Sequence, residues 1–147
     1  MMDLSRTYRT TSPEETERLG SELASELKAG DCVALTGELG GGKTRFVRGI
    51  ARGLSSKGFV KSPSFTIMNI YEGGSLPLYH IDLYRLASTE ELEAAGLEEY
   101  ILGDGVSVIE WAERSPSLLK SCRITVSFRY ISDTEREIEV VIKGAGK

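Results

Sequence analysis

Apolar residues follow two different spacings along this chain, one typical of strands and the other typical of helices. Residues 32–36, CVALT, form a short and almost continuous apolar run, as expected for a strand buried on both faces. Further on, apolar residues recur at helical spacing: Phe46, Val47, Ile50 and Leu54. The pattern therefore predicts a buried strand, then a loop, then an amphipathic helix.

Another strand and helix are predicted before residue 32. Residues 4–10 have the β-branched and aromatic content of a short strand. Ser12 suits a helix N-cap, Pro13 the first helical position, and Glu15 completes a capping box. The apolar stripe of this helix consists of leucines four residues apart: Leu19, Leu23 and Leu27. Gly30 is a natural stop signal for the helix.

The second half of the chain is richer in strands. Strand-like composition marks residues 65–71, 78–84, 106–111, 123–130 and 136–143. A capped helix is predicted to begin at Ser88 or Thr89, and a short amphipathic stretch follows it at residues 97–102.

The order β-α-β-loop-α-β-β-α-β-β-β mixes crossovers that suit parallel strands with adjacent pairs that suit antiparallel ones. We therefore expect an α/β fold, with one mixed sheet flanked by helices and a C-terminal antiparallel hairpin. A length of 147 residues suits a single domain covering residues 1–147.

Composition narrows the function classes. The net charge of −4 gives no reason to expect strong direct binding to nucleic acid. No apolar run approaches the length of a membrane span, and the first residues lack the apolar centre of a secretory signal, so a cytoplasmic protein is expected. Cys32 and Cys122 stand far apart with no CxxC, and we expect two separate, buried thiols.

The loop between the predicted strand and helix reads TGELGGGKTR over residues 36–45 and contains the pattern G-x-x-x-x-G-K-[ST]. Glycines let successive backbone N–H groups turn inward around phosphate oxygens, and the N-terminus of the helix that follows favours an anion. Lys43 would reach the β- and γ-phosphates, and the Thr44 hydroxyl would bind Mg²⁺. A nucleotide site of the P-loop type is therefore predicted at Gly37, Glu38, Leu39, Gly40, Gly41, Gly42, Lys43, Thr44 and Arg45.

Such a site also needs an acid for the metal, normally at the end of a neighbouring apolar strand. Asp82 closes LYHID and Glu110 closes VSVIE, and the spacing does not choose between them. His80 suits a hydrogen-bonded structural residue better than a base, and Arg85 suits phosphate or a carboxylate equally well. Trp111 is typical of a core residue or of a shield beside the nucleotide.

Four blocks of the sequence resemble the TsaE family, also called YjeE, small bacterial P-loop ATPases of the tRNA threonylcarbamoyladenosine pathway. They are GELGGGKT (37–44), SPSFTI (62–67), HIDLYR (80–85) and VIEW (108–111). Their order and spacing cover the chain from Thr11 to the final hairpin. The resemblance implies ATP and Mg²⁺ as ligands.

The resemblance also implies roles for single residues. Glu110 would be the acid near Mg²⁺, and Asp82 would belong to a second, switch-like element. Either could position the attacking water. The remaining residues assigned to the switches or placed beside the site are Ser64, Thr66, His80, Arg85 and Trp111.

Partners follow from the same resemblance: a TsaD-type threonylcarbamoyl transferase and its TsaB-type paralogue, with tRNA contacted only through that complex. The chain would hydrolyse ATP weakly alone and reset the complex between turnovers. Two alternatives share the loop, namely a nucleotide-sensing module with little hydrolysis and a small-molecule kinase. A GTPase fits less well because no NKxD-type motif occurs.

Overall fold

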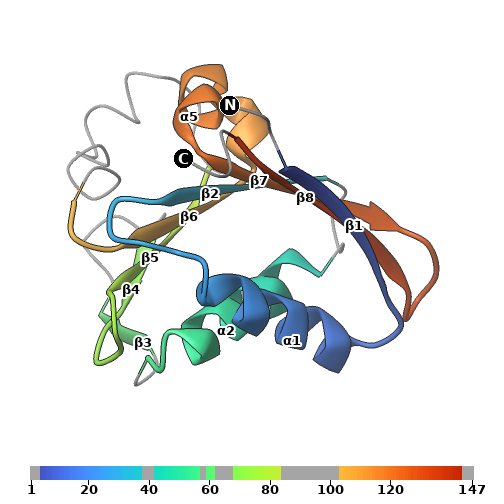
Figure 1. Ribbon diagram of the computed structural model, residues 1–147, viewed down its shortest axis with the longest axis horizontal. Coiled ribbons are helices and arrows are strands. Elements are labelled where there is room, and N and C mark those ends of the chain that lie inside the picture. Colours follow the sequence, from blue (N-terminus) through green and yellow to red (C-terminus); the bar gives the residue numbers. More distant parts are fainter. Residues whose placement is uncertain (1–3, 38–41, 57–58, 62–67, 84–102, 144–147) are drawn as a thin grey trace.

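The computed structural model describes residues 4–37, 42–56, 59–61, 68–83 and 103–143 (Figure 1). The strands are β1 (Leu4–Thr10), β2 (Cys32–Gly37), β3 (Phe59–Lys61), β4 (Met68–Tyr71), β5 (Leu78–Asp82), β6 (Val106–Glu110), β7 (Ile124–Tyr130) and β8 (Arg136–Ile142). The helices are α1 (Pro13–Ala24), α2 (Lys43–Gly53), the 3-10 helix η1 (Ala112–Arg114) and α5 (Pro116–Ser121). None of the described helices is long and apolar enough to span a membrane.

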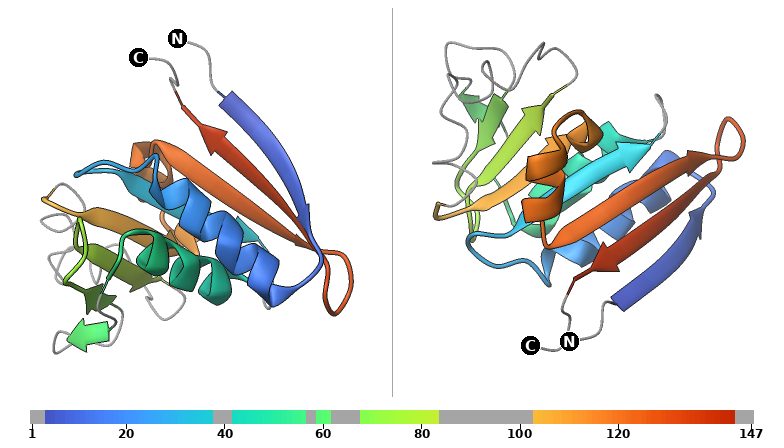
Figure 2. Two further views of the ribbon diagram at one scale, coloured as in Figure 1. Left: turned by 60° about the horizontal axis from the view of Figure 1, so that its bottom comes forward. Right: turned by 90° about the horizontal axis from the view of Figure 1, so that it is seen from above.

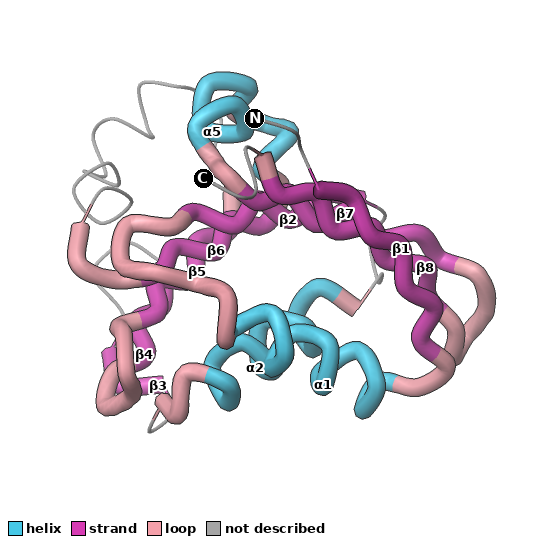
Figure 3. The backbone as a smooth tube through the Cα atoms, in the orientation of Figure 1, coloured by secondary structure: helices cyan, strands magenta, loops and turns pink. Residues whose placement is uncertain are grey.

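The described strands form one eight-stranded sheet in the order β1-β8-β7-β2-β6-β5-β4-β3 (Figure 3). The four central strands β7, β2, β6 and β5 run parallel to one another. The strands outside them pair antiparallel, and β7 and β8 form the C-terminal hairpin. The predicted mixed sheet and hairpin are thus confirmed, and the apolar run at residues 32–36 is a central strand.

Helices cover both faces of the sheet. α1 and α2 lie side by side on one face, and α5 with η1 lies on the other (Figures 1 and 2). Alternate residues of β2 serve the two cores, because Val33 and Leu35 pack on the α1–α2 side while Ala34 packs on the α5 side. Residues buried on both faces explain why β2 reads as a continuous apolar run.

The start of α1 follows the predicted capping chemistry. Ser12 is the N-cap and its hydroxyl accepts a hydrogen bond from the Glu15 amide at 3.1 Å. Glu15 reaches back to the Thr11 amide at 2.6 Å, one residue before the position that a standard capping box uses. The predicted end at Gly30 was wrong, because α1 stops at Ala24 and a tighter turn continues through Leu27.

Close contact between α1 and α2 depends on glycine. A Cβ atom at Gly49 would collide with the Glu17 carbonyl oxygen, and one at Gly20 would collide with the Phe46 carbonyl oxygen. The two helix backbones therefore approach more closely than side chains at these positions would allow. This contact fixes α2 against α1 as well as against the sheet.

The expectation of two separate thiols was wrong. Cys32 and Cys122 are both buried, as predicted, but they form a disulfide with their Cα atoms 4.6 Å apart. Cys32 begins β2, and Cys122 lies just before β7, which pairs with β2. Sheet order brings the two sulfur atoms together, and spacing along the sequence carries no sign of that order.

Among the remaining predictions, the longer helices and strands were predicted better than the short ones. Strands at 106–110, 124–130 and 136–142 lie within one residue of the predicted ends. The short elements β3, η1 and α5 were not predicted. The helix expected from Ser88 or Thr89 and the stretch at 97–102 lie outside the described residues.

Candidate functional site

The site lies where the parallel strands end. β2 ends at Gly37, and α2 begins at Lys43, so the glycine-rich loop (residues 37–44) joins a central strand to a helix as predicted. Gly42 is the N-cap of α2 with φ +93°, and among the described residues no side chain caps the helix. The first N–H groups of a helix have no partner within the helix, which suits them to binding an anion.

Gly37 is required by its surroundings. Its φ of +120° lies where side chains are strained, and a Cβ atom there would collide with the Phe128 carbonyl of β7. The Gly37 amide also lies 3.5 Å from Glu113 Oε2, a contact that nothing in the sequence indicates. The loop therefore leaves β2 in tight contact with its neighbouring strand.

Lys43 is the most unusual residue of the site. It is only 5% exposed, its Nζ donates to the Gly37 carbonyl at 3.2 Å, and Nζ lies 3.9 Å from the centre of the Trp111 ring. Within the described residues, no carboxylate forms an ion pair with it. Because buried charges are normally paired, a buried ammonium held by a carbonyl and a ring suits an anionic ligand.

Asp82 and Glu110 are neighbours across the sheet. They end β5 and β6, and they are directly paired in the parallel register. Strand alternation places both on the α2 side, because Ile81 and Ile109, the residues just before them, belong to the core on the α5 side. The structure therefore brings together the two acids that the sequence left as alternatives.

His80 is bound to one of these acids. Its Nε2 forms a short hydrogen bond with Glu110 Oε2, and both side chains are nearly buried. His80 is thus the hydrogen-bonded residue that the sequence favoured, and its partner is now identified. The contact fixes the Glu110 carboxylate at the edge where α2 begins.

The other predicted residues are placed as follows. Thr44 is exposed at the first turn of α2, and Trp111 stands beside Lys43 in a left-handed conformation with φ 59°. Arg45 turns to α1, where its Nε lies 2.8 Å from Glu17 Oε1. The remaining predicted residues lie outside the described part of the chain: Glu38, Leu39, Gly40, Gly41, Ser64, Thr66 and Arg85.

The side chains that could bind a metal at the site are few among the described residues. In the described residues, no three His, Cys, Asp or Glu side chains gather closely enough to hold a metal ion on their own. Mg²⁺ keeps several waters and is usually bound through one or two protein carboxylates together with phosphate oxygens. The paired acids and Thr44 are suitable oxygen donors of this kind.

Hydrogen bonds shift the pKa of several groups outside the glycine-rich loop. Hydrogen bonds from the Thr11 amide and hydroxyl lower the pKa of Glu15, and the hydrogen bond to Asp133 raises the pKa of Tyr130. The hydrogen bond to Asp31 raises the pKa of Arg123, which ties the start of β7 to the residue before β2.

Fold and site together define a mixed α/β protein in which a glycine-rich loop leads from a central parallel strand into a helix that begins with a buried lysine. The model of the family described as threonylcarbamoyl adenosine biosynthesis protein TsaE matches residues 10–138. The chain belongs to the TsaE family, as its four sequence blocks indicated.

Individual relatives of the chain support the same family assignment. The chain is 42% identical over 137 residues to the tRNA threonylcarbamoyladenosine biosynthesis protein TsaE of Bacillus subtilis, covering 93% of this chain and 85% of that protein. The TsaE protein of Treponema pallidum is 44% identical over 129 residues, with 88% and 95% covered. The crystal structure of Bacillus subtilis YdiB is similar at a TM-score of 0.75 and 36% identity, covering 98% of this chain and 89% of that one.

Proposed function

We propose that this protein is a Mg²⁺-dependent ATPase that supports threonylcarbamoyladenosine modification of tRNA. The observation that carries the proposal is Lys43, a buried cation without a carboxylate partner among the described residues, at the start of α2. A phosphate group in the glycine-rich loop would supply the missing negative charge. Family membership supports the pathway, because the matching family is described by threonylcarbamoyl adenosine biosynthesis.

Specific residues of the chain would hold the ligands. Lys43 and the first N–H groups of α2 would bind phosphate oxygens, and Thr44 with Glu110 would hold Mg²⁺. Bound Mg²⁺ would polarise the phosphoryl group and neutralise charge that develops on it. The hydrogen bond from His80 would keep the Glu110 carboxylate in a single orientation for this role.

Hydrolysis also requires an oriented water. Asp82 and Glu110 stand side by side on paired strands, so either carboxylate would accept a hydrogen bond from the water and position it for attack. Lys43 would stabilise negative charge on the phosphates as the bond to the leaving group lengthens. Residues outside the described ranges, Ser64 and Thr66 among them, would complete the site as switches.

The proposed target is a complex of a TsaD-type transferase with a TsaB-type paralogue, which hydrolysis would reset between turnovers. Direct tRNA binding does not enter the proposal, since a net charge of −4 opposes affinity for a polyanion. Weak hydrolysis by the isolated chain and stronger hydrolysis with the complex are expected.

Lys43→Ala tests the nucleotide site. The variant should bind ATP with Mg²⁺ roughly tenfold more weakly or worse and hydrolyse it roughly 10²-fold more slowly. It should still fold, since the change removes a buried charge that lacks a carboxylate partner in the described part of the chain. Titration calorimetry and phosphate release measure the two effects.

Lys120→Ala is the matched control, because Lys120 is exposed on α5, on the opposite face of the sheet. It should bind and hydrolyse ATP like the wild-type protein. A Lys43→Ala protein that binds ATP as tightly as wild type would refute the proposed site.

A further inference from the structure

A cavity of about 380 Å³ opens between α2 and the strands β4 and β5. Thr44, at the start of α2, and His80, on β5, both line it. The cavity therefore adjoins the candidate site on two sides, through the residue after Lys43 and through the partner of Glu110. Its size is at the lower end for a ligand pocket.

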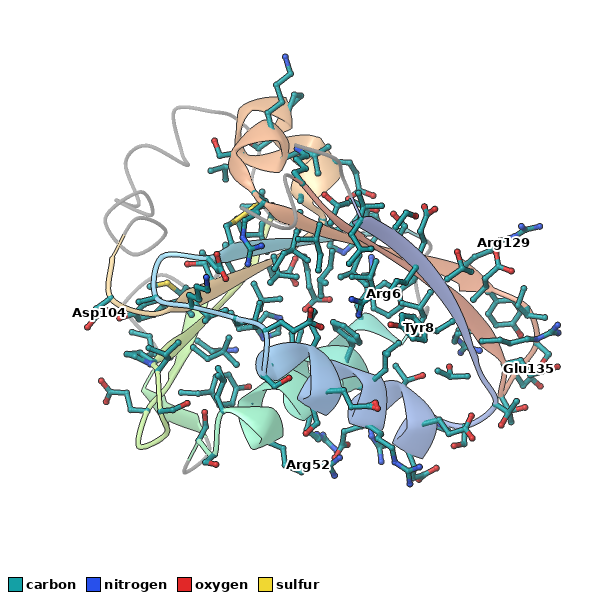
Figure 4. All side chains as sticks on the ribbon, in the orientation of Figure 1. Arg6, Tyr8, Arg52, Asp104, Arg129 and Glu135 are labelled. Atoms are coloured by element: carbon teal, nitrogen blue, oxygen red, sulfur yellow. A yellow bond between two sulfur atoms is a disulfide. The ribbon has the colours of Figure 1, made fainter. Side chains whose placement is uncertain are left out.

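Two arginines of α2 give the cavity its charge. Arg48 and Arg52 lie one helical turn apart and both line it. Arg52 is held by Glu17 at 2.7 Å and projects from α2 on the side away from the sheet (Figure 4). Arg48 is exposed, and among the described residues it has no ion-pair partner. Among the described residues, the cavity lining therefore carries one positive charge, that of Arg48, without a carboxylate partner.

Two residues that line the cavity carry buried polar atoms without hydrogen-bond partners in the described structure. Ser56 Oγ and His80 Nδ1 are buried and make no hydrogen bond there. Buried polar atoms in proteins almost always have a partner, so a cavity lined by two such atoms is suited to receive polar groups. Val47, Ala51 and Tyr71 contribute apolar surface beside them.

We propose that this cavity receives an acidic segment of the partner protein, with Arg48 as the principal anchor for a carboxylate. The exposed arginine holds the carboxylate at the surface, while the cavity accepts one or two side chains that hydrogen-bond to Ser56 and His80. Guanidinium and carboxylate groups bind in a fixed bidentate geometry, which fits a segment carried on a folded partner.

Docking in this cavity would affect the candidate site. An inserted segment would contact Thr44, a proposed Mg²⁺ ligand, and His80, the hydrogen-bond partner of Glu110. It would thereby order the residues that bind Mg²⁺ and the acid that orients water. This inference rests on the proposed function, since it assumes that the chain acts on a partner complex.

The test compares the affinity of the TsaB–TsaD pair of the same organism for wild-type and Arg48 variants, by biolayer interferometry at physiological salt. Arg48→Ala should weaken binding roughly tenfold, as loss of a charged anchor in an interface does. Arg48→Glu should weaken it further, and Arg48→Lys should fall between wild type and alanine. Wild-type affinity should also decrease more steeply with salt than that of Arg48→Ala.

Arg129→Ala and Arg129→Glu are the controls. Arg129 lies on the β7–β8 hairpin, far from Arg52 in Figure 4, and its ion pair with Glu137 is exposed. These variants should bind the pair like wild type, and thermal unfolding checks that every variant folds. Both arginines are exposed, so neither change removes a buried contact.

Each outcome is decisive. If the wild-type protein binds the pair and the Arg48 variants bind it with the same affinity, this inference is overturned. The proposed ATPase function is unaffected by that result. A wild-type chain that does not bind the pair would overturn the partner assignment as well. Binding of sodium glutamate at Arg48, without any effect of Arg48 on the pair, would make the cavity a small-anion site and refute docking of an acidic segment.

Discussion

Lys43 and Trp111 form the most informative pair of residues in the molecule. The Lys43 ammonium lies 3.9 Å from the centre of the Trp111 ring, and the chain contains no other tryptophan. Trp111 holds this position through a left-handed backbone, which is uncommon for a bulky residue and is typical of functional sites. The pair connects the glycine-rich loop to the end of β6.

Trp111 emission should therefore report nucleotide binding. A phosphate group in the loop would draw the Lys43 ammonium away from the ring and change the electric field on the indole. Titrating ATP with Mg²⁺ into the wild-type protein should give a saturating fluorescence change. The Lys43→Ala protein should give none over the same range, and an unchanged signal at concentrations where calorimetry detects binding would contradict the expected movement.

For single residues, the sequence predicts which side chains belong to the site better than it predicts which side chains contact one another. Lys43 stands out through the pattern G-x-x-x-x-G-K-[ST], and Asp82 and Glu110 stand out because each closes an apolar strand. The His80–Glu110 hydrogen bond and the Glu113 contact with the loop depend on which strands are neighbours. The disulfide between Cys32 and Cys122 was missed for the same reason.

Among the helices and strands, α1 is stabilised at its N-terminus by a cap whose hydrogen bonds involve a charged carboxylate. The Glu15 carboxylate accepts hydrogen bonds from the Thr11 amide and hydroxyl, and the amide bond is the main cause of its lowered pKa. A carboxyl group with a lowered folded-state pKa stabilises the fold above its ordinary pKa of about 4.3 and loses that contribution as pH falls through the folded-state value.

Glu15→Gln should remove this pH dependence. Its amide oxygen can still accept the hydrogen bonds, so only the charge-dependent part is lost. Denaturant unfolding should find the variant less stable than wild type at pH 7. The difference should shrink and vanish as pH falls through the folded-state pKa of Glu15, which lies below the ordinary glutamate value. A difference that stays constant down to pH 3 would exclude the carboxylate charge as the cause.

The crossing of α1 and α2 should not tolerate a methyl group. Gly49→Ala places a Cβ atom against the Glu17 carbonyl, and the helices must separate to accept it. We expect a loss of about 1–3 kcal/mol in the free energy of unfolding, although alanine favours a helix more than glycine does. Arg18→Ala on the exposed face of α1 is the control and should change little.

Element prediction succeeded where patterns were long. β7, β8 and α2 each extend over at least seven residues, and their periodicity or β-branched content is clear. α5 has six residues and β3 has three, which is too short for a period to emerge. The early end of α1 was missed because Leu27 is buried by the following turn as well as it would be by a helix.

For the molecule as a whole, sheet order decides the location of the site. Placing β2 between β7 and β6 puts the glycine-rich loop beside Glu110, and placing β5 next to β6 adds Asp82 and His80 at the same edge. The sequence predicted a mixed sheet but not this order, because pairing of distant strands leaves no local signal. The four sequence blocks supplied the family instead.

The measurement that tests the proposed function most directly is ATP hydrolysis by the protein alone and with its organism's TsaB–TsaD pair, each with and without Lys43→Ala. We predict slow hydrolysis alone, clear stimulation by the pair, and loss of the stimulated rate in the variant. Equal rates with and without a pair that demonstrably binds would contradict a partner-activated ATPase and favour a nucleotide-sensing module.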